Sequence, residues 1–209
     1  SIALASILIT TNASAYVFIN ESRCPNGASW SSSNQPQSYW INENGSDDIG
    51  FSTLQSLIQD SWDAWGAPCC SSFAASYQGT TTQTATSTNG NTVLSWEENG
   101  WPTQLGNVNQ TIGVTLISVY NSCEIAQAPI LFNGVGFQFV SSGPGTDMQS
   151  IATHEIGHNI GLGHSPDTSA TMYAAYRGGT AARSLGQDDV AGVCALYNTS
   201  CNCSSDADC

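Results

Sequence analysis

The chain contains no lysine, and only three arginines supply positive charge: Arg23, Arg177 and Arg183. Its 16 acidic residues give a formal net charge of −13, and charged residues make up 9% of the chain against about 25% in an average globular protein. Nucleic acid and anionic membranes attract basic surfaces, so the composition argues against both as partners. Hydrophobic residues make up 40% of the 209, which is enough for one core beneath an uncharged polar surface.

The chain also lacks long apolar runs. A membrane-spanning helix needs about 20 apolar residues, and no segment of the sequence reaches that length. The segment SIALASILI at residues 1–9 is apolar, and Ala13-Ser14-Ala15 has the small-x-small pattern of a signal-peptidase site. We therefore expect residues 1–15 to be a partial signal peptide, because neither an initiator Met nor a basic leading segment precedes the run. A buried N-terminal strand or helix is the alternative. The signal peptide predicts a secreted, extracellular protein.

Pairs of the form CxxC are absent, which removes the spacing typical of a four-cysteine zinc site. The cysteines are nevertheless numerous and even in number, which indicates an oxidising compartment and structural disulfide bonds. The spacing leaves their connectivity open, although the adjacent Cys69 and Cys70 are expected to bond to different partners. The eight cysteines are Cys24, Cys69, Cys70, Cys123, Cys194, Cys201, Cys203 and Cys209.

Hydrophobic periodicity predicts both strands and helices. Strands are predicted over 38–42, 73–77, 92–96, 111–120, 129–132 and 137–140, and the β-branched run TIGVTLISVY at 111–120 is the strongest of them. Helices are predicted over 54–65, 146–161 and 187–197. Ser52 or Thr53 is the expected cap of the first helix. The second is expected to begin at Thr146 or Asp147, because Thr146 and Gln149 have the spacing of a capping box.

The segment HEIGHNIGLGH holds all three histidines of the chain. On a helix, residues four apart share a face, so His154 and His158 can direct nitrogens at one metal ion. Gly161 permits a sharp turn that brings His164 back as a third ligand. Three neutral imidazoles are typical of an open tetrahedral zinc site whose fourth position takes water. Glu155, one residue round the helix, can accept a proton from that zinc-bound water and later deliver it to the leaving amine.

The alternative is a helix whose histidines are satisfied by ordinary hydrogen bonds. A bare H-E-x-x-H occurs by chance in unrelated helices, but the extended pattern also fixes a glycine and a third histidine. Histidines scattered along the surface or through the core would not all fall within one such pattern. The sequence therefore predicts one catalytic Zn2+.

The pattern H-E-x-x-H-x-x-G-x-x-H, with Ser165 and then Thr171-Met172-Tyr173 behind it, resembles the metzincin clan of zinc peptidases and, within it, the matrixins. In that clan a methionine turn lies beneath the zinc, and Met172 matches that methionine. Matrixins typically carry Ser after the third histidine and a Met-Tyr pair. Ala174 stands where astacins and serralysins place a tyrosine ligand. The resemblance covers residues 39–197 in the order of the elements, and it is strong at residue level over 153–197.

The segment LGQDDVAGVCALY at 185–197 is similar to the matrixin C-terminal helix. The resemblance implies that Asp188 and Asp189 support the methionine turn, as Gly161 supports the turn before the third histidine. It also implies an α+β, metzincin-like fold. That fold has a twisted mixed five-stranded sheet, two long helices above a zinc cleft and a small C-terminal helical subdomain. The catalytic domain would then span 16–197, with 198–209 as a Cys-rich tail or a truncated module.

The resemblance further implies where a protein or peptide substrate binds. The strand over 111–120 would form the edge of the sheet along the cleft, and an exposed edge can pair with an extended peptide. From the sequence, an ordinary buried core strand remains equally open. Residues 173–183 would form the wall of the pocket on the primed side of the substrate. The expected substrate-binding residues are Gly113, Val114, Thr115, Leu116 and Tyr173.

Comparison with the matrixins bears on a second zinc, on Cys24 and on calcium. Animal matrixins carry a second, structural zinc on further histidines, and we expect none here because the catalytic site uses all three. Arg23-Cys24-Pro25 partly resembles the cysteine switch, but a disulfide is the more reasonable fate of Cys24. Ca2+ is a candidate second cofactor because the family often binds it, although no full calcium-loop motif occurs. The candidate acids, which can equally be solvated, are Asp47, Asp48, Glu97 and Glu98.

The function that the sequence favours is that of a secreted, monomeric zinc endopeptidase that hydrolyses peptide bonds. Two alternatives remain. One is a non-catalytic secreted binding module that retains a structural zinc site, and the other is a zinc hydrolase that acts on non-peptide substrates. Glu155 argues against the module, since a structural zinc site needs no general base.

Overall fold

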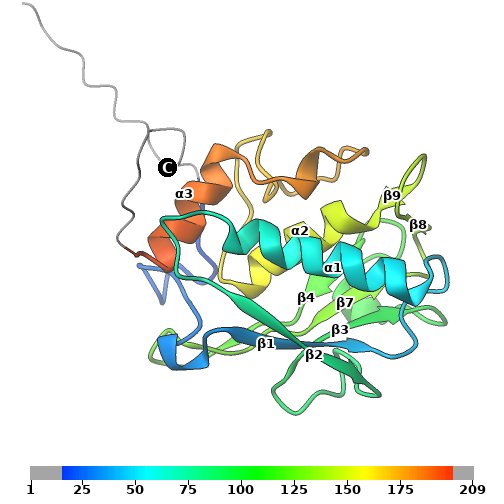
Figure 1. Ribbon diagram of the computed structural model, residues 1–209, viewed down its shortest axis with the longest axis horizontal. Helices are drawn as coiled ribbons and strands as arrows, with labels where there is room; N and C mark the ends of the chain where they lie inside the picture. Colours follow the sequence, from blue (N-terminus) through cyan, green and yellow to red (C-terminus); the bar gives the residue numbers. More distant parts are fainter. Residues whose placement is uncertain (1–15, 200–209) are drawn as a thin grey trace, which may run out of the picture.

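The protein is described by a computed structural model over residues 16–199, so the predicted signal peptide and almost all of the predicted tail lie outside the described residues. A mixed five-stranded sheet carries the fold (Figure 1), with strands in the order β2-β1-β3-β7-β4. The first four run parallel, and β4 is antiparallel to β7. The strands are β1 (Gln37–Asn42), β2 (Ala75–Thr81), β3 (Thr92–Glu97), β4 (Gly113–Thr115) and β7 (Ile130–Asn133).

Two helices, α1 (Phe51–Gly66) and α2 (Met148–Asn159), lie side by side on one face of the sheet (Figure 1). Tyr39 of β1 points into this layer, where its ring stacks on Trp62 with centroids 4.9 Å apart. Trp65 of α1 donates its indole N–H to the carbonyl oxygen of Thr153 at 2.8 Å, which joins the two helices. Leu54, Ile58, Trp62 and Trp65 of α1 are 0–1% exposed. This arrangement confirms the expected sheet with two long helices.

The opposite face of the sheet carries a second, smaller apolar cluster. Its buried members are Ala85, Trp101 and Leu131, with Leu105, Val108, Val114 and Leu116 packed against them. The long connections on either side of β3 supply most of these residues, so both faces of the central strands are covered. This explains why the sequence of β3 is an almost continuous buried run, with its first five residues buried, rather than an alternating one.

The remaining elements are short. They are η1 (Ser32–Asn34), η2 (Thr103–Leu105), β5 (Ser118–Val119), β6 (Ile125–Gln127), β8 (Phe139–Val140), β9 (Thr146–Asp147), η3 (Ala181–Arg183) and α3 (Gln187–Leu196). Helix α3 packs apart from the two-helix layer, near the first described residues (Figure 1). Among residues 16–199, none of the helices is both long and apolar enough to cross a bilayer.

The predicted long strand over 111–120 is wrong, because the chain breaks there into β4 and β5. Thr115 pairs with Ile130, and the next amide, that of Leu116, donates to the carbonyl oxygen of Pro129. Pro129 has no N–H, so the ladder cannot continue past it. The chain then leaves the sheet, and β5 pairs with β6 instead. The strands predicted over 73–77 and 137–140 are also shifted or shortened, to β2 and β8.

The predicted cap of the first helix is wrong, whereas the second helix is capped by Asp147, one of the two residues predicted for its start. Helix α1 begins at Phe51 behind Gly50, which makes no side-chain cap, so neither Ser52 nor Thr53 has that role. Helix α2 is capped by Asp147, whose carboxylate accepts the amide of Ser150 at 2.9 Å, and Thr146 belongs to β9. A local pattern of Thr and Gln therefore indicated the region of the helix start but not the residue that caps it.

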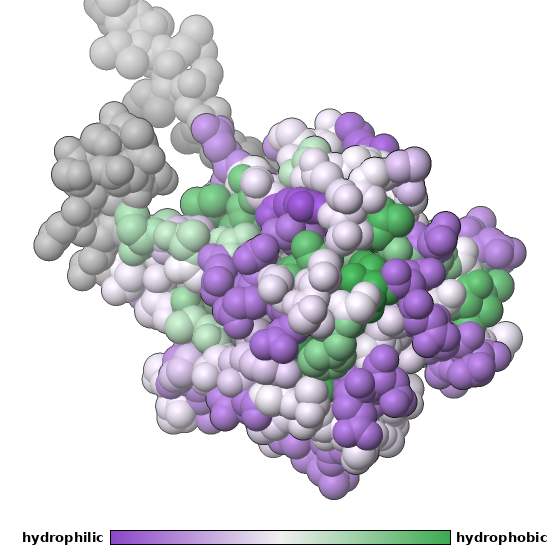
Figure 2. Space-filling view, turned by 45° about the vertical axis from the view of Figure 1, so that its right-hand side comes forward, coloured by the Kyte–Doolittle hydropathy of each residue, from purple (hydrophilic) through white to green (hydrophobic). Residues whose placement is uncertain are grey.

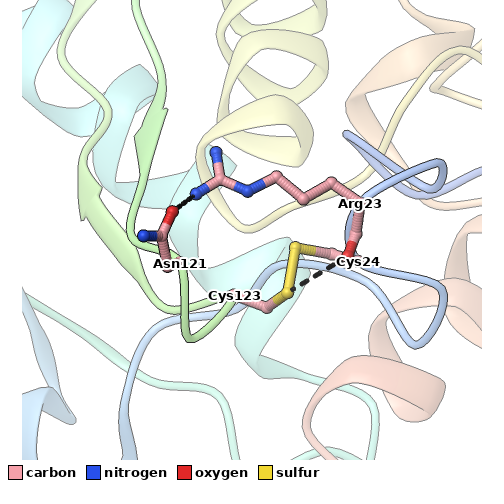
Figure 3. Close-up of a disulfide and its surroundings, with 4 residues drawn as sticks. All are labelled: Arg23, Cys24, Asn121 and Cys123. Atoms are coloured by element: carbon pink, nitrogen blue, oxygen red, sulfur yellow. Dashed lines mark hydrogen bonds between the residues drawn. A yellow bond between two sulfur atoms is a disulfide. The ribbon is translucent and has the colours of Figure 1, made fainter.

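Two disulfides lie within the described residues. Cys24–Cys123 joins the first described segment to the turn between β5 and β6, and beside it Arg23 donates to the Asn121 side-chain oxygen (Figure 3). Cys70–Cys194 joins the segment after α1 to α3. The two bonds connect residues that lie 99 and 124 positions apart in sequence. They assign Cys24 to a disulfide, as the sequence analysis expected.

Figure 2 shows that the surface seen from this side is mostly hydrophilic or of intermediate hydropathy, with apolar residues in smaller patches. Because charged residues are only 9% of the chain, uncharged side chains supply most of this polarity.

Replacing Cys24 and Cys123 together by alanine should lower the free energy of unfolding by about 2–5 kcal/mol, since the disulfide closes a long loop. Denaturant unfolding of the oxidised parent and the double variant measures the difference. If the parent under reducing conditions unfolds at the same denaturant concentration as it does oxidised, the stabilising role of both disulfides is wrong.

Candidate metal centre and cleft

The three histidines converge because a helix and a turn place them. His154 and His158 lie on one face of α2, and His164 returns to that face after the helix ends at Ile160. Gly161 has φ +109°, and a Cβ there would overlap the carbonyl oxygen of Ala28. The turn therefore needs glycine for both its backbone conformation and the close approach of Ala28.

The first described segment holds this turn from outside. The amide of Ile19 donates to the carbonyl oxygen of Gly161 at 2.9 Å, and the amide of Gly163 donates to that of Val17 at 2.7 Å. An isolated bridge between Phe18 and Leu162 completes the pairing. The loop that carries the third histidine is thus held to the rest of the fold by backbone hydrogen bonds.

The ring nitrogens fit a tetrahedral zinc ion. One ligand atom from each histidine lies within 4.8 Å of the others, and Nε2 of His158 is 3.2 Å from Nε2 of His164. Imidazole nitrogens at about 2.0–2.1 Å from zinc in a tetrahedron are roughly 3.3 Å apart. Nδ1 of His154 lies 2.7 Å from the carbonyl oxygen of Thr171, and Nδ1 of His158 lies 2.7 Å from that of Leu162. A carbonyl oxygen can only accept, so Nδ1 carries the proton and Nε2 is left for the metal.

Burial favours the neutral form of His158 and His164. It lowers the pKa of His158 to about 3, with the neighbouring His154 as a smaller cause. Burial, followed by the charge of His154, also lowers the pKa of His164. Because a protonated imidazole cannot bind a metal, both shifts favour metal binding at neutral pH.

Glu155 lies beside the histidines with its carboxylate inside the protein, since the residue is 5% exposed. Burial raises the pKa of Glu155, while the charge of His154 and a hydrogen bond from Thr115 act in the opposite direction. The hydroxyl of Thr115 donates to Oε2 of Glu155 at 2.8 Å. A carboxylate in this position is more basic than one in water, which suits a group that takes up a proton.

Met172 lies beneath the histidines, where it is 2% exposed. A Cβ at Gly157 would overlap the Met172 sulfur, so helix and turn are in direct contact. The carboxylate of Asp189 accepts the amides of Thr171 at 2.6 Å, Met172 at 3.0 Å and Gly186 at 2.8 Å. Asp189 therefore contacts the methionine turn itself. Asp188 contacts the residue after the third histidine, because the hydroxyl of Ser165 donates to its carboxylate at 2.6 Å.

A cavity of about 720 Å³ opens beside the histidines. Gly113 contributes to one wall, and the other wall is formed by the segment from Tyr173 to Ala182. The Arg177 guanidinium lies 4.6 Å from the Tyr173 ring centroid, which stiffens that wall. Other lining residues are Gln110, Thr111, Ile112, Ser150, Ile151, His154, Glu155, His164, Thr171, Ala174, Ala175, Tyr176 and Ala181.

The predicted substrate-binding residues are divided between two sides of β4. Gly113 and Tyr173 line the cavity, whereas the side chains of Val114 and Leu116 pack against the smaller cluster on the opposite face of the sheet. Thr115 points at Glu155. Strand β4 lies at the edge of the sheet, and Gly113 at its start lines the cavity.

Sequence reasoning missed several residues of the site. Ile151 lines the cavity one helical turn before His154, and its spacing alone could have placed it there. The carbonyl groups that hold the histidine rings could not be predicted, because backbone atoms leave no trace in the sequence. The ion pair described below could not be predicted either, because its two residues lie far apart in the chain.

Three of the four acids considered for Ca2+ accept hydrogen bonds from backbone amides. Glu98 accepts the amide of Asp47 at 3.1 Å, and Asp48 accepts that of Phe139 at 2.8 Å. Glu97 accepts the amide of Gly100 at 3.2 Å. Within the described residues the histidine triad is the group of metal-ligating side chains that converges, so calcium binding stays a prediction.

One ion pair anchors the cavity wall to α2. Arg183 of η3 donates to the Asp147 carboxylate from both Nε, at 2.9 Å, and Nη2. Its Nη2 also donates to the carbonyl oxygen of Ser141 at 2.7 Å. Burial alone would raise the pKa of Asp147, but the hydrogen bonds from Arg183 and Ser150 outweigh it and lower that pKa overall.

Replacing Arg183 by glutamine should cost about 2 kcal/mol of unfolding free energy at pH 7, less than a fully buried pair because the Arg183 side chain is 26% exposed. The folded pKa of Asp147 is lowered, so this stability is present above its unfolded pKa and is lost as pH falls through the folded value. Unfolding of parent and Arg183→Gln from pH 7 down to 2 should therefore converge in acid. Arg23→Gln is the matched control, and a difference that persists unchanged at pH 2 contradicts the account.

The Asp189→Asn variant keeps the side-chain size but turns an amide toward backbone N–H groups. It should lower the free energy of unfolding by about 2–4 kcal/mol, because hydrogen bonds to a charged group contribute about 1.5–3 kcal/mol each. Thermal or denaturant unfolding measures the loss. The exposed Asp63→Asn on α1 is the control, and equal small effects of the two changes would show that the turn does not depend on the carboxylate.

Comparison with known proteins agrees with this geometry. The chain matches the Matrixin family over residues 81–198, which is more than half of its length. It is 54% identical over 57 residues to Metalloendoproteinase 1-MMP of Arabidopsis thaliana, which covers 27% of this chain and 16% of that protein. It is 42% identical over 59 residues to human Matrilysin, which covers 28% of this chain and 22% of that protein.

A further relative is Metalloendoproteinase 1 of Glycine max, 49% identical over 51 residues, or 24% of this chain and 17% of that protein. The alignments thus span less than a quarter of each of these three relatives. The matched range nevertheless includes the edge strand, the histidine helix, the methionine turn and α3. The histidine centre, the turn beneath it and the family match together identify the chain as a member of the matrixin family.

Proposed function

We propose that the protein is a secreted, zinc-dependent endopeptidase. The observation that carries the proposal is a buried carboxylate, Glu155, beside three converging imidazoles, a ligand set that leaves a fourth coordination position for water. A purely structural zinc site is closed by four protein ligands and has no use for a buried general base. The membership of the matrixin family and the relatives named as metalloendoproteinases support the same conclusion.

Each residue of the metal centre has a separate role in the proposed reaction. Nε2 atoms of His154, His158 and His164 would hold zinc, which when bound lowers the pKa of water and polarises the scissile carbonyl group. Glu155 takes the proton from the attacking water and delivers it to the leaving amine. Met172 and the carbonyl groups behind the histidines keep the ligands in place and exclude water from beneath them.

An extended peptide is the substrate that the cleft fits. Strand β4 is paired with β7 on one side and forms the edge of the sheet on the other, and Gly113 at its start lines the cavity. A peptide that lies antiparallel or parallel to it can add a strand through backbone hydrogen bonds, which selects for peptides over small amides. Residues 173–183 face this edge, and they would contact the side chain that follows the cleaved bond.

Secretion is proposed from the cysteines, because disulfides such as Cys24–Cys123 and Cys70–Cys194 persist in oxidising compartments. The predicted signal peptide agrees with that proposal. We further propose that the protein acts as a monomer on protein or peptide substrates.

The test combines cleavage and metal content in one sample. The parent protein should bind about one zinc per chain, cleave a peptide library, and lose this activity when treated with a chelator. Glu155→Ala should keep the zinc and lose at least about 100-fold in kcat/KM, the lower range of general-base contributions. Glu43→Ala, an exposed glutamate on the loop after β1, is the matched control and should behave as the parent does.

Zinc-loaded parent that cleaves no member of the library would favour the non-catalytic binding module. A Glu155→Ala variant that cleaves as well as the parent would contradict the assignment of the general base. Cleavage that a chelator leaves unchanged would contradict the role of the metal.

A further inference from the structure

Strand β4 presents two different faces to the protein. Successive side chains of a strand alternate, so Gly113 and Thr115 lie on one face while Val114 and Leu116 lie on the other. The second pair packs against the cluster of Ala85, Trp101 and Leu131. The first pair faces α2 at the position of Glu155. The inner face of the edge strand therefore contacts the candidate general base.

The hydroxyl of Thr115 has two acceptors on the same residue. It lies 2.8 Å from Oε2 and 2.9 Å from the backbone carbonyl oxygen of Glu155. A hydroxyl has one proton, so it donates to one of them at a time. The carbonyl group belongs to α2 and can accept a helical hydrogen bond, whereas the buried carboxylate depends on side chains and water for its partners. The carboxylate is thus the acceptor that gains more from this hydroxyl.

Gly113 controls the space around the other carboxylate oxygen. A Cβ there would lie 3.0 Å from Oε1 and from Cγ of Glu155, and 3.1 Å from Cδ. Such a contact is closer than van der Waals packing favours, so a larger residue would press the carboxylate away from β4. Thr115 holds one oxygen while Gly113 leaves room at the other.

We infer that Thr115 is a positioning residue for the general base rather than a contact for substrate. Its hydroxyl fixes Oε2 of Glu155, so that Oε1 is presented to the water molecule whose proton it accepts. A buried carboxylate without this bond could rotate about its side-chain torsions, and small displacements of a catalytic group reduce turnover strongly. The inference rests on the proposed function, because it assigns Thr115 to the same reaction.

The kinetic test uses two substitutions of Thr115. Thr115→Val keeps the β-branched shape and removes the hydroxyl, and it should lower kcat by roughly 10- to 100-fold with KM within about twofold of the parent. Thr115→Ser retains the hydroxyl and should remain within about threefold of the parent kcat. Thr80→Val, an exposed threonine on β2, is the matched control and should leave both constants unchanged. Zinc content is measured on each variant so that a lost metal is not mistaken for a lost hydroxyl.

A second measurement separates the carboxylate from the carbonyl group and needs no activity. In chelator-treated protein, the loss of unfolding midpoint caused by Thr115→Val should shrink by at least half when Glu155 has been replaced by alanine. Glu155→Met, which fills the same volume, serves in the same cycle if the alanine variant does not fold. A Thr115→Val effect that is equally large in both backgrounds would show that the hydroxyl serves the backbone carbonyl group, and it would overturn the inference.

The outcomes distinguish this inference from the proposed function. An active, chelator-sensitive parent whose kcat is unchanged by Thr115→Val leaves the endopeptidase in place and contradicts the positioning role. Equal losses in Thr115→Val and Thr115→Ser also contradict it, because the hydroxyl would then not be the operative group. An inactive zinc-loaded parent contradicts the proposed function, and the contact between Thr115 and Glu155 is then decided by the stability cycle alone.

Discussion

Three imidazole nitrogens must point at one metal position while staying roughly 3.3 Å from one another, and much of the structure maintains that geometry. A straight helix supplies only His154 and His158, so the chain has to reverse within a few residues to return His164. Gly161 makes the reversal, at a left-handed φ of +109° and in contact with the backbone of Ala28. The backbone pairing of residues 17–19 with 161–163 then fixes the turn, which links the first described segment to the geometry of the site. The methionine turn closes the space beneath.

A second constraint concerns the buried carboxylate of Glu155. Removal from water raises its pKa, and the neighbouring histidine and the Thr115 hydroxyl moderate the cost of keeping it charged. The edge strand is what brings that hydroxyl to the helix. Strand β4 therefore relates to the chemistry in two ways, since Gly113 at its start lines the cavity and its inner face contacts the base. A peptide docked on this strand would lie against the element that positions the catalytic group.

The parts that could be predicted from the sequence depend on near neighbours in the chain. The spacing of His154 and His158 and the glycine before His164 predicted the converging triad, and helical periodicity predicted α1 and α2. The break between β4 and β5 depends on Pro129, which immediately precedes the partner strand β7 and lacks the N–H that the ladder needs. The disulfide partners and the contact of Thr115 with Glu155 join residues 40 to 124 positions apart. No local pattern encodes such pairs, so only the folded chain reveals them.

The central claim is that the triad forms an open zinc centre, with protein ligands at three positions and water at the fourth. X-ray absorption spectroscopy at the zinc edge measures this coordination directly on the zinc-loaded protein. The account predicts about one zinc per chain, with three imidazole nitrogens at about 2.0–2.1 Å and one further oxygen. A sulfur ligand or a carboxylate ligand from the protein would contradict it, as would a protein that retains no stoichiometric zinc.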